Sequence, residues 1–378
     1  MIPSVASDTP PRPGPDDELR IVFAGGGSGG HIYPALAVAR EALARPGKPC
    51  HVLFLVTPEG LEKGVVESHG LPCATIPAVR LVARNALSIL PGMWAGIRAA
   101  RQAMRVFRPH VLYGTGGFVS FPAVVAAWLE GVPALLHEPN TVPGRANRLL
   151  ARISRGVVTH FEQSACHFPR GLSVHDLGTP LRYEYDPGRR QTGSTRTLLI
   201  LGGSQGARRL NMVVRSLYHR LAAKVDLRVI HLTGTRDHAE VVAGLGQGHP
   251  NVEIVAYTEE MDKILYRTDF AVCRAGALTV SELVEFSVPA IYVPFPGAVG
   301  NHQFENARSL KERGASEILE ETELTEERLM AEIDRMSQAQ NLQKYRAALV
   351  PFRRPGATRR VLEALDSLVH AASRADGD

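Results

Sequence analysis

The 378-residue chain has few cysteines, and they lie too far apart to form a metal-binding Cys-x-x-Cys pair or a disulfide framework. The four are Cys50, Cys73, Cys166 and Cys273. Apolar sequence comes in short stretches, and the longest, 118–129, could not cross a bilayer. These absences argue against a zinc knuckle, a disulfide-rich secreted domain and a membrane-spanning helix. They predict a cytoplasmic protein that is either soluble or attached to a membrane surface.

Charge of one sign is also scarce. The chain has 43 Lys and Arg against 38 Asp and Glu, a net charge of +5, so we predict no nucleic-acid partner. The exception is the segment 80–108, which has six arginines and no acidic residue. Its apolar residues include Leu87, Ile89, Leu90 and Trp94, a mixture suited to an anionic membrane surface. A core-facing helix with a solvated basic side would have the same pattern, so both interpretations stay open.

Short apolar runs alternate with longer helical patterns, which favours β-α units and parallel sheets. The predicted strands of the first half are Arg20 to Ala24, His51 to Val56, Val111 to Tyr113, Ala134 to Leu136 and Val157 to Thr159. We predict an α/β protein with two Rossmann-like domains facing a cleft. The expected divisions are a disordered Pro-rich tail (1–18), a first domain (19–182), a linker (183–196), a second domain (197–352), and a C-terminal helix and tail (353–378) able to pack back on the first domain.

Two matched pairs of segments support the two-domain prediction. The strand, glycine turn and helix of 19–37 return as TLLILGGSQGARRLN at 197–211. The segments 114–139 and 274–296 each contain a glycine turn, a helix, Val-Pro-Ala and a strand. Because both pairs occur in the same order, the halves should share one architecture, with the binding site in the cleft between them.

Residues 25–30 read GGGSGG and follow an apolar run. A glycine loop between a strand and a helix lets backbone N–H groups approach phosphate, which the helix dipole also favours. Gly25, Gly27 and Gly30 satisfy the dinucleotide fingerprint as well, so a nicotinamide or flavin oxidoreductase has to be weighed. The second glycine loop at 202–207 and the histidine that follows the first one weigh against it. Neither loop is followed by the Lys-Ser/Thr of a P-loop.

His31 comes directly after the first glycine loop, and Pro34 suits the first turn of the helix expected there. The positive end of that helix disfavours imidazolium, so a neutral ring able to accept a proton is expected. This is what a general base requires. A histidine that only caps the helix or contacts the opposite domain would fit the sequence equally well.

The second half offers complementary groups. Ser204, in the second glycine loop, could donate its hydroxyl to a phosphate. The segment 274–282 opens a helix whose first turn, Ala277 to Thr279, can present N–H groups to a second phosphate oxygen. Glu282 follows about one turn later and could accept hydrogen bonds from a pair of sugar hydroxyls, although a lone helical Glu is usually a solvated residue.

Two further polar groups are expected at the cleft. His302 and Gln303 follow a Pro-Gly loop, and their imidazole and amide could read sugar hydroxyls. Glu138 and Asn140 end the matching strand of the first half, so their side chains should face the same cleft. We expect Glu138 to support catalysis rather than to act directly.

Six ordered motifs together resemble the MurG family of N-acetylglucosaminyltransferases, and the resemblance runs from about Leu19 to Leu365. They are GGGSGGHIYPALA, GTGGFVSFPAVVAA, HEPNTVPGRANRLLAR, GGSQGARRLN, RAGALTVSELVE and PFPGAVGNHQFENA. The resemblance implies a glycosyltransferase of the GT-B type. It implies transfer of GlcNAc from UDP-GlcNAc to the C4 hydroxyl of undecaprenyl-diphospho-MurNAc-pentapeptide, with inversion and without a bound metal. It further implies peripheral attachment to the inner face of the cell membrane and a possible cell-wall synthesis complex.

The resemblance also assigns residues by motif. Those that fall where the family binds the nucleotide sugar are Ser28, Gly29, Gly30, Asn140, Arg182, Ser204, Ala277, Leu278, Thr279, Val280, Ser281, Glu282 and Gln303. Within this set Glu282 would hold the ribose, Gln303 the GlcNAc, and Ser204 with the 277–279 turn the diphosphate. The first glycine loop is also the family's proposed seat of the acceptor diphosphate, and His31 is its candidate base.

The sequence departs from the family pattern at three places. Thr179 replaces the usual Asn of a Gly-Asn-Pro motif, and Phe118 replaces a frequent Tyr. Thr258 stands at the uracil-contacting position, which is usually aliphatic, so that contact is in doubt.

No cofactor or metal is expected. The one Asp-x-Asp, at 376–378, lies at the extreme C-terminus, where it could not clamp a diphosphate through Mg²⁺. The alternatives are the dinucleotide oxidoreductase, a non-catalytic scaffold that keeps the fold, and a related GT-B enzyme with a diacylglycerol-type acceptor. The intact His31, Glu282 and Gln303 argue against the scaffold.

Overall fold

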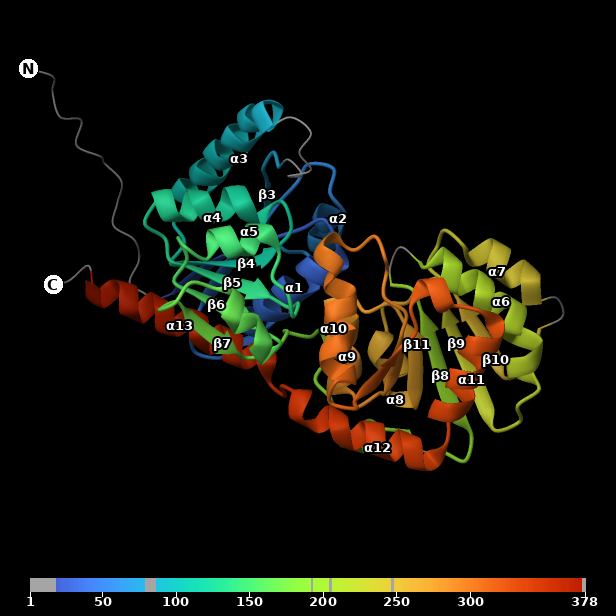
Figure 1. Cartoon of the computed structure of the whole chain (residues 1–378). Coiled ribbons are helices and arrows are strands. Elements are labelled where there is room, and N and C mark those ends of the chain that lie inside the picture. Colours follow the sequence, from blue (N-terminus) through green and yellow to red (C-terminus); the bar gives the residue numbers. More distant parts are fainter. Residues whose placement is uncertain (1–17, 79–85, 192, 204–205, 246–247, 376–378) are drawn as a thin grey trace, which may run out of the picture.

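The computed structural model describes residues 18–78, 86–191, 193–203, 206–245 and 248–375. Within them two parallel sheets stand side by side, each with helices on both faces (Figure 1). We call the seven-stranded sheet within 19–176, together with its helices and the last helix of the chain, the first lobe. The six-stranded sheet within 196–318, together with its helices up to Leu349, is the second lobe. The Pro-rich tail 1–17 and Ser204 lie outside the described residues.

The first sheet has the strand order β3-β2-β1-β4-β5-β6-β7, and all its strands are parallel. The strands are β1 (Leu19–Gly25), β2 (Cys50–Val56), β3 (Cys73–Thr75), β4 (Val111–Gly116), β5 (Ala134–Glu138), β6 (Gly156–Thr159) and β7 (Ser173–Asp176). The helices are α1 (Gly29–Ala44), α2 (Leu61–Ser68), α3 (Ala86–Phe107), α4 (Ser120–Leu129) and α5 (Arg145–Leu150).

The second sheet repeats this plan with the order β10-β9-β8-β11-β12-β13. Its strands are β8 (Arg196–Leu201), β9 (Leu227–Leu232), β10 (Val252–Val255), β11 (Phe270–Cys273), β12 (Ala290–Tyr292) and β13 (Ser316–Ile318). Its helices are α6 (Arg208–Ala222), α7 (His238–Leu245), α8 (Met261–Arg267), α9 (Ala277–Glu285), α10 (His302–Lys311), α11 (Glu326–Met336) and α12 (Ala339–Leu349).

The burial of the strands explains why they could be predicted from apolar runs in the sequence. The central strands β1 and β8 read LRIVFAG and RTLLIL, and almost every residue of each is buried. Parallel strands covered by helices on both faces need such continuous apolar sequence rather than alternation. The predicted fold class of two Rossmann-like sheets is therefore confirmed.

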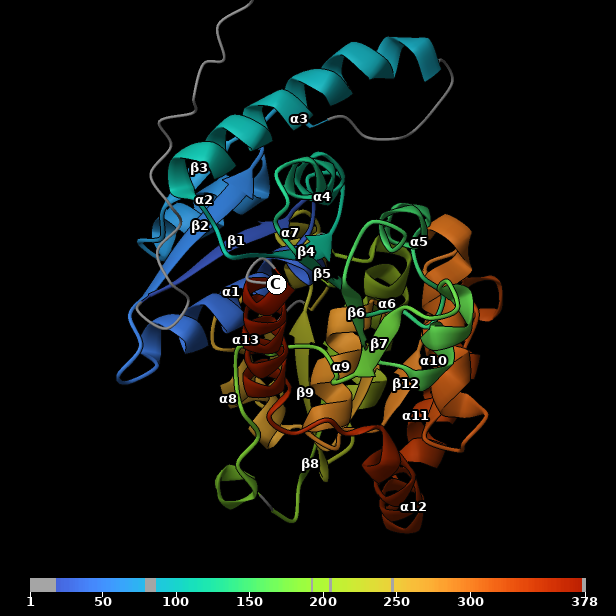
Figure 2. The same cartoon turned by 90° about the vertical axis from the view of Figure 1, so that its left-hand side faces the viewer.

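After α12 the chain crosses back from the second lobe to its last helix, α13 (Ala357–Ala375), which lies against the first lobe (Figures 1 and 2). This helix packs against α1, and Val361, Leu362 and Leu365 are buried in the same apolar cluster as the strands of the first sheet. The chain therefore connects the lobes twice, once between β7 and β8 and once between α12 and α13.

Each sheet reverses its strand order at one point, where a ligand-binding crevice is expected in an open α/β sheet. In the first lobe this point lies between β1 and β4, and in the second between β8 and β11. The loops after these four strands carry the two glycine loops, the Gly114–Gly117 turn and the segment 274–276. The fold thus brings the motifs from the sequence to the ends of neighbouring strands.

In the part of the chain that the structure describes, no helix combines the length and the apolar character needed to cross a membrane.

Candidate active site

The candidate site has two walls, one from each lobe. In the first wall, the glycine turns that follow β1 and β4 lie in close contact. Gly27 has a φ of +88°, and a Cβ there would approach the Phe118 ring to 2.6 Å. A Cβ on Gly117 would lie 2.0 Å from the carbonyl oxygen of Gly26. Side chains larger than hydrogen therefore cannot occupy these positions, and the turns after β1 and β4 can meet only as glycine.

α1 begins at Gly29, and Ser28 is its N-cap residue without a side-chain cap. Within the described residues, the backbone N–H groups of Ser28, Gly29 and Gly30 make no hydrogen bond. These three groups sit at the positive end of the helix and are available to an anion. The N–H of Gly27 is not available, because it donates to the Glu62 carboxylate at 3.1 Å.

Glu62 is a residue of this wall that sequence reasoning did not identify. Its carboxylate, on α2, also accepts from the N–H and the hydroxyl of Thr57, and these hydrogen bonds hold the pKa of Glu62 below its usual range against the effect of burial. It is buried against the glycine loop, since Cβ atoms on Gly26 and Gly60 would both collide with it. The Glu62 carboxylate thus holds the glycine loop in place through the N–H of Gly27. The Gly-x-Glu of 60–62 was the only sequence signal for it.

His31 lies in the first turn of α1, and its Nδ1 is 2.8 Å from the carbonyl oxygen of Thr115. A carbonyl can only accept, so Nδ1 carries the proton and Nε2 keeps its lone pair. Burial lowers the pKa of His31, and the hydrogen bond to Thr115 and the charge of Glu138 only partly oppose it. The ring is therefore neutral at pH 7, with its basic nitrogen free to accept a proton.

Glu138 and Asn140 lie at the end of β5 but are occupied by the loop itself. The Glu138 carboxylate accepts four hydrogen bonds, from the N–H and the amide of Asn140, the N–H of Gly144 and the amide of Asn147, at 2.9–3.0 Å. It therefore shapes the loop and acts on His31 only through its charge. The Asn140 amide also contacts the second lobe, where Asn306 donates to its Oδ1.

The second wall begins at α9, whose N-cap is Gly276. In the described residues, the N–H groups of Ala277, Leu278 and Thr279 make no hydrogen bond, which leaves them free for an anion. Val280 differs, because its N–H donates to Gly276 and its side chain is buried in the second-lobe core. The sequence predicted that the whole run 277–282 binds the nucleotide sugar. In the structure, the N–H groups available to a ligand are those of its first turn, 277–279.

Glu282 is 6% exposed, and burial raises its pKa to about 7, while Arg182 lowers it. The Arg182 guanidinium lies 3.9 Å from the Glu282 carboxylate and stacks 4.0 Å above the centre of the Tyr33 ring. Arg182 therefore links α1 of the first lobe to α9 of the second. Lone helical Glu residues are usually solvated, so the burial of Glu282 against a single cation marks it as unusual.

His302 and Gln303 lie in the first turn of α10. The Gln303 Oε1 accepts from the N–H of Phe295 at 3.0 Å, which leaves the amide NH₂ free of protein partners among the described residues. The His302 Nδ1 contacts the carbonyl of Val299 at 2.7 Å. His302 also acts electrostatically on His31 and lowers its pKa, so the two walls carry their histidines close together.

Thr258 precedes α8, and its hydroxyl accepts from the N–H of Glu260 at 3.0 Å. Its neighbour Tyr257 was not identified from the sequence. The Tyr257 hydroxyl lies 3.1 Å from the hydroxyl of Tyr33, so this pair joins the lobes on the Arg182 side of the site.

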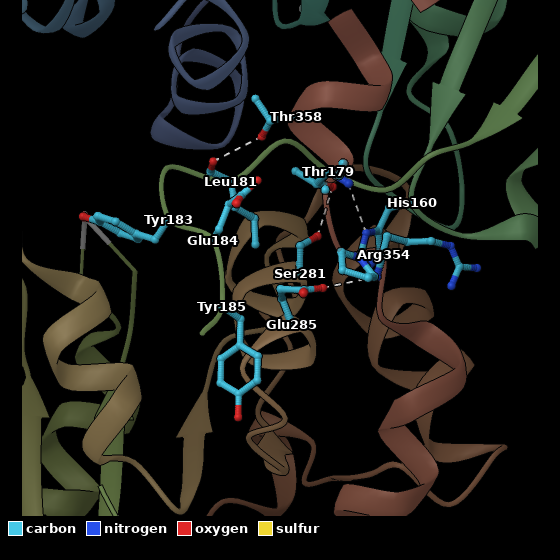
Figure 3. A pocket seen from close by; sticks show the side chains of 13 residues that line it. His160, Thr179, Leu181, Tyr183, Glu184, Tyr185, Ser281, Glu285, Arg354 and Thr358 are labelled. Carbon is cyan, nitrogen blue, oxygen red and sulfur yellow. Dashed lines mark hydrogen bonds between the residues drawn. The ribbon is translucent and has the colours of Figure 1, made fainter. Parts of the chain in front are cut away.

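A separate cavity of about 100 Å³ lies at the interlobe junction, between α9 and the segments that connect the lobes (Figure 3). Ser281 points into it and contacts the Thr179 hydroxyl at 3.0 Å, and the N–H of Thr179 donates to His160. The Ser281 side chain thus faces the junction rather than the α9 amides. Nucleotide-sized ligands need about 300 Å³ or more, so this cavity is not the substrate site.

Among the described residues no group of three or more His, Cys, Asp or Glu side chains is arranged to hold a metal ion.

The chain matches two family models. Residues 21–159 match the glycosyltransferase family 28 N-terminal domain, and residues 197–355 match its C-terminal domain. These ranges correspond to most of the first and second lobes.

Relatives with a named activity match the chain over most of its length. A UDP-N-acetylglucosamine–N-acetylmuramyl-(pentapeptide) pyrophosphoryl-undecaprenol N-acetylglucosamine transferase from Desulforudis audaxviator is 35% identical, covering 94% of this chain and 100% of the relative. The protein of the same name from an Anaeromyxobacter species is 39% identical over 83% of this chain and 84% of its own length.

Solved structures agree on the architecture. The crystal structure of MurG from Acinetobacter baumannii has a TM-score of 0.75 and 30% identity, covering 92% of this chain and 99% of that one. A calicheamicin glycosyltransferase, at 17% identity and a TM-score of 0.69, shares the fold. On this sequence similarity, the chain belongs to the MurG family of glycosyltransferases.

Proposed function

We propose that this chain transfers GlcNAc from UDP-GlcNAc to the C4 hydroxyl of undecaprenyl-diphospho-MurNAc-pentapeptide, with inversion at the anomeric carbon. The family and the names of its relatives support the reaction. The observation that carries the mechanism is the tautomer of His31, whose Nε2 is free and basic on the wall opposite Glu282 and Gln303.

In this mechanism the second lobe holds the donor. The carboxylate of Glu282 accepts hydrogen bonds from the ribose hydroxyls, and the free amide of Gln303 binds the GlcNAc. The N–H groups of Ala277, Leu278 and Thr279 stabilise the charge that develops on the departing UDP, because they lie at the positive end of α9. We also propose that the hydroxyl of Ser204, in the glycine loop 202–207, donates a hydrogen bond to the diphosphate of the donor.

The first lobe holds the acceptor. The free N–H groups of Ser28, Gly29 and Gly30 bind the acceptor diphosphate. His31 Nε2 takes the proton of the C4 hydroxyl as its oxygen attacks C1 of GlcNAc from the face opposite to UDP. One C–O bond forms as another breaks, and the configuration at C1 inverts. General-base catalysis of this kind contributes about 10²- to 10⁴-fold to a rate.

We also propose that the first lobe attaches peripherally to the anionic inner face of the cell membrane. On α3, Trp94 is 64% exposed and Leu90 is also exposed; on the adjacent α4, Trp128 is 56% exposed and Leu129 is also exposed. We call Leu90, Trp94, Trp128 and Leu129 the apolar face. The side chains of Leu87 and Ile89, also expected in this contact, lie outside the described residues.

The acid-free segment 80–108 predicted uncompensated positive charge on α3, and the structure differs. Arg101 and Arg105 of α3 both pair with Glu130 at the end of α4, so they are partly neutralised. The exposed side chains of Arg145 and Arg148 on α5, and of Arg152 in the turn after it, have no ion-pair partner among the described residues, so this region adds unpaired positive charge. Together the apolar face and these arginines suit a surface of anionic lipid.

The transfer is tested by incubating the purified chain with UDP-GlcNAc and the lipid-linked MurNAc-pentapeptide. We expect a disaccharide-lipid whose new linkage is β by NMR, formed equally with and without EDTA. A parallel reaction with diacylglycerol should give no glycolipid, and NAD⁺ should not bind in titration. Product with diacylglycerol alone, or a reaction abolished by EDTA, would contradict the proposal. Co-purification from membranes tests association with a cell-wall synthesis complex.

A further inference from the structure

A buried asparagine amide joins the two lobes beside the proposed site. Asn306 lies in α10 of the second lobe, and its side chain is 0% exposed. Its Oδ1 accepts from the backbone N–H of Thr141, in the first lobe, at 2.9 Å. Its Nδ2 donates to the Oδ1 of Asn140 at 3.1 Å and to the carbonyl oxygen of Ala275 at 3.2 Å. One side chain therefore bonds to both walls of the site.

The first-lobe end of this link is rigid. Asn140 is held by Glu138 through its N–H and its amide, and its carbonyl accepts from the hydroxyl of Ser164 at 2.8 Å. Glu138 in turn binds Gly144 and Asn147. The loop therefore cannot follow Asn306 without giving up several buried hydrogen bonds.

The second-lobe end lies within the donor wall. Asn306 follows Gln303 by three residues on the same helix, so the two lie on neighbouring turns of one face. Its partner Ala275 comes just before Gly276, the N-cap of the helix that presents the free amides at 277–279. A shift of Asn306 would therefore move the sugar-binding and phosphate-binding groups relative to the first lobe.

We propose that Asn306 is a positioning residue that sets the register between the His31-bearing lobe and the donor wall during transfer. Its planar amide has an acceptor on one side and donors on the other, so only one relative placement of the lobes satisfies all three hydrogen bonds. The residue acts through Asn140 and α10. The inference rests on the proposed glycosyl transfer.

The central variants are Asn306→Ala and Asn306→Asp. Both remove the Nδ2 donor, and the Asp variant also places a carboxylate oxygen against two acceptors. We expect kcat to fall about 10- to 100-fold in each, the rate equivalent of one or two buried hydrogen bonds. UDP affinity by calorimetric titration should change little, since the nucleotide contacts lie within the second lobe.

Asn251→Ala is the matched control for loss of stability. Asn251 uses its amide to donate to the carbonyls of Ala222, Lys224 and Leu227, all within the second lobe. Its loss should lower the melting temperature as Asn306→Ala does but leave kcat unchanged. Equal losses of kcat in the two variants at equal destabilisation would reduce Asn306 to a structural residue and overturn the proposal.

A double-mutant cycle tests the named partner. If both side chains act through one hydrogen bond, Asn140→Ala combined with Asn306→Ala should be no slower than the slower single variant. Losses of kcat that multiply would contradict the link.

An interlobe distance separates this inference from the proposed reaction. Spin labels at exposed Cys166 and at Val225→Cys, in a background with Cys50→Ser and Cys73→Ser, report the two lobes without any turnover. We expect Asn306→Ala to broaden the distance distribution, and an unchanged distribution would overturn the positioning role. If the unmodified chain makes no disaccharide-lipid but Asn306→Ala still broadens the distribution, the reaction fails while the interlobe link stands.

Discussion

The two lobes share one strand order around their switch points, yet each places a different titratable group there. In the first lobe His31 lies in the first turn of α1, which follows the central strand, and burial lowers its pKa. In the second lobe Glu282 stands one turn into α9, and burial raises its pKa to about 7. Burial favours the neutral form of each group, but a base needs the neutral form and a ribose-binding carboxylate needs the charged one.

The contrast shows that the same fold can prepare one wall for chemistry and the other for binding. His31 is ready to accept a proton as the structure stands, because its tautomer is set by the carbonyl of Thr115. Among the described residues, the group that favours the charge of Glu282 is Arg182 alone. We therefore expect the first wall to control turnover and the second to control donor affinity.

The largest effect is expected at His31. His31→Ala should lower kcat about 10²- to 10⁴-fold, because the carboxylates described in the first wall, Glu62 and Glu138, are held by hydrogen bonds within its loops. The donor KM should change little. His31→Gln should be equally slow, since its amide can still reach Thr115 but is not a base. His219→Ala, on the exposed side of α6, is the control and should keep full activity. Steady-state kinetics that show a raised donor KM with unchanged kcat would reverse the comparison.

The next largest effect is expected at Glu282. Glu282→Ala should raise the donor KM about 10- to 100-fold, because the ribose hydroxyls lose a charged acceptor in a buried site. With a folded-state pKa of about 7, the carboxyl is mainly protonated at pH 6 and mainly ionised at pH 8. Donor affinity should therefore rise with pH across this range.

Proton release provides the direct check on this carboxyl. Hydrogen bonds from the ribose favour the ionised form, so UDP binding at pH 6 should release up to about one proton. Titrations in buffers of different ionisation enthalpy measure this number. Glu282→Gln should release fewer protons, and a binding heat independent of buffer in the unmodified chain would exclude this role.

The sequence was sufficient for the fold because parallel strands covered on both faces must be continuously apolar. It also predicted that His31 and Glu282 face a common cleft, and in the structure Arg182 links the two helices that carry them. The predicted place of Pro34 in the first helical turn is wrong, because α1 begins at Gly29 and Pro34 lies in its second turn. A proline at this place leaves one helical hydrogen bond unmade, the one that an N–H of residue 34 would donate to the carbonyl of Gly30.

What the sequence could not predict depends on contacts between distant segments. Glu62, Asn306 and Tyr257 are ordinary polar residues in the linear order, and only the folded chain places them against the glycine loop or across the lobes. Similarly, the absence of acids in 80–108 suggested uncompensated charge, but Glu130 comes from a different helix. Spacing along one segment carries no information about such partners.

The two lobes also differ in their exposed surfaces, and a lipid-binding assay tests that difference. Trp94→Ser and Trp128→Ser should each reduce partition onto anionic liposomes about tenfold, because each removes a large exposed apolar side chain from the apolar face. Val225→Ser is the control, since Val225 is 94% exposed but lies on the second lobe. Co-sedimentation measures the partition, and circular dichroism checks the fold. An equal loss with Val225→Ser would mean that no particular lobe faces the membrane.

The smallest effect is expected where the lobes touch through Tyr33 and Tyr257. Burial and the shared hydrogen bond raise the pKa of Tyr33 to about 12, so the contact should persist at all ordinary assay pH values. Tyr33→Phe keeps the ring on which Arg182 stacks and removes only the hydroxyl. A partly exposed neutral hydrogen bond is worth about 1 kcal/mol, so we expect a two- to fivefold change in donor kcat/KM.

Tyr257→Phe should match Tyr33→Phe, and the double variant should add nothing further, because both hydroxyls take part in one bond. Tyr33→Ala should cost more than Tyr33→Phe, since it also removes the surface under Arg182 and leaves that guanidinium freer to move from Glu282. If the Phe and Ala variants were equal, the ring would have no part in holding Arg182. The second wall would then be organised without the first, and the division of labour between the lobes would have to rest on Asn306 and the interlobe junction alone.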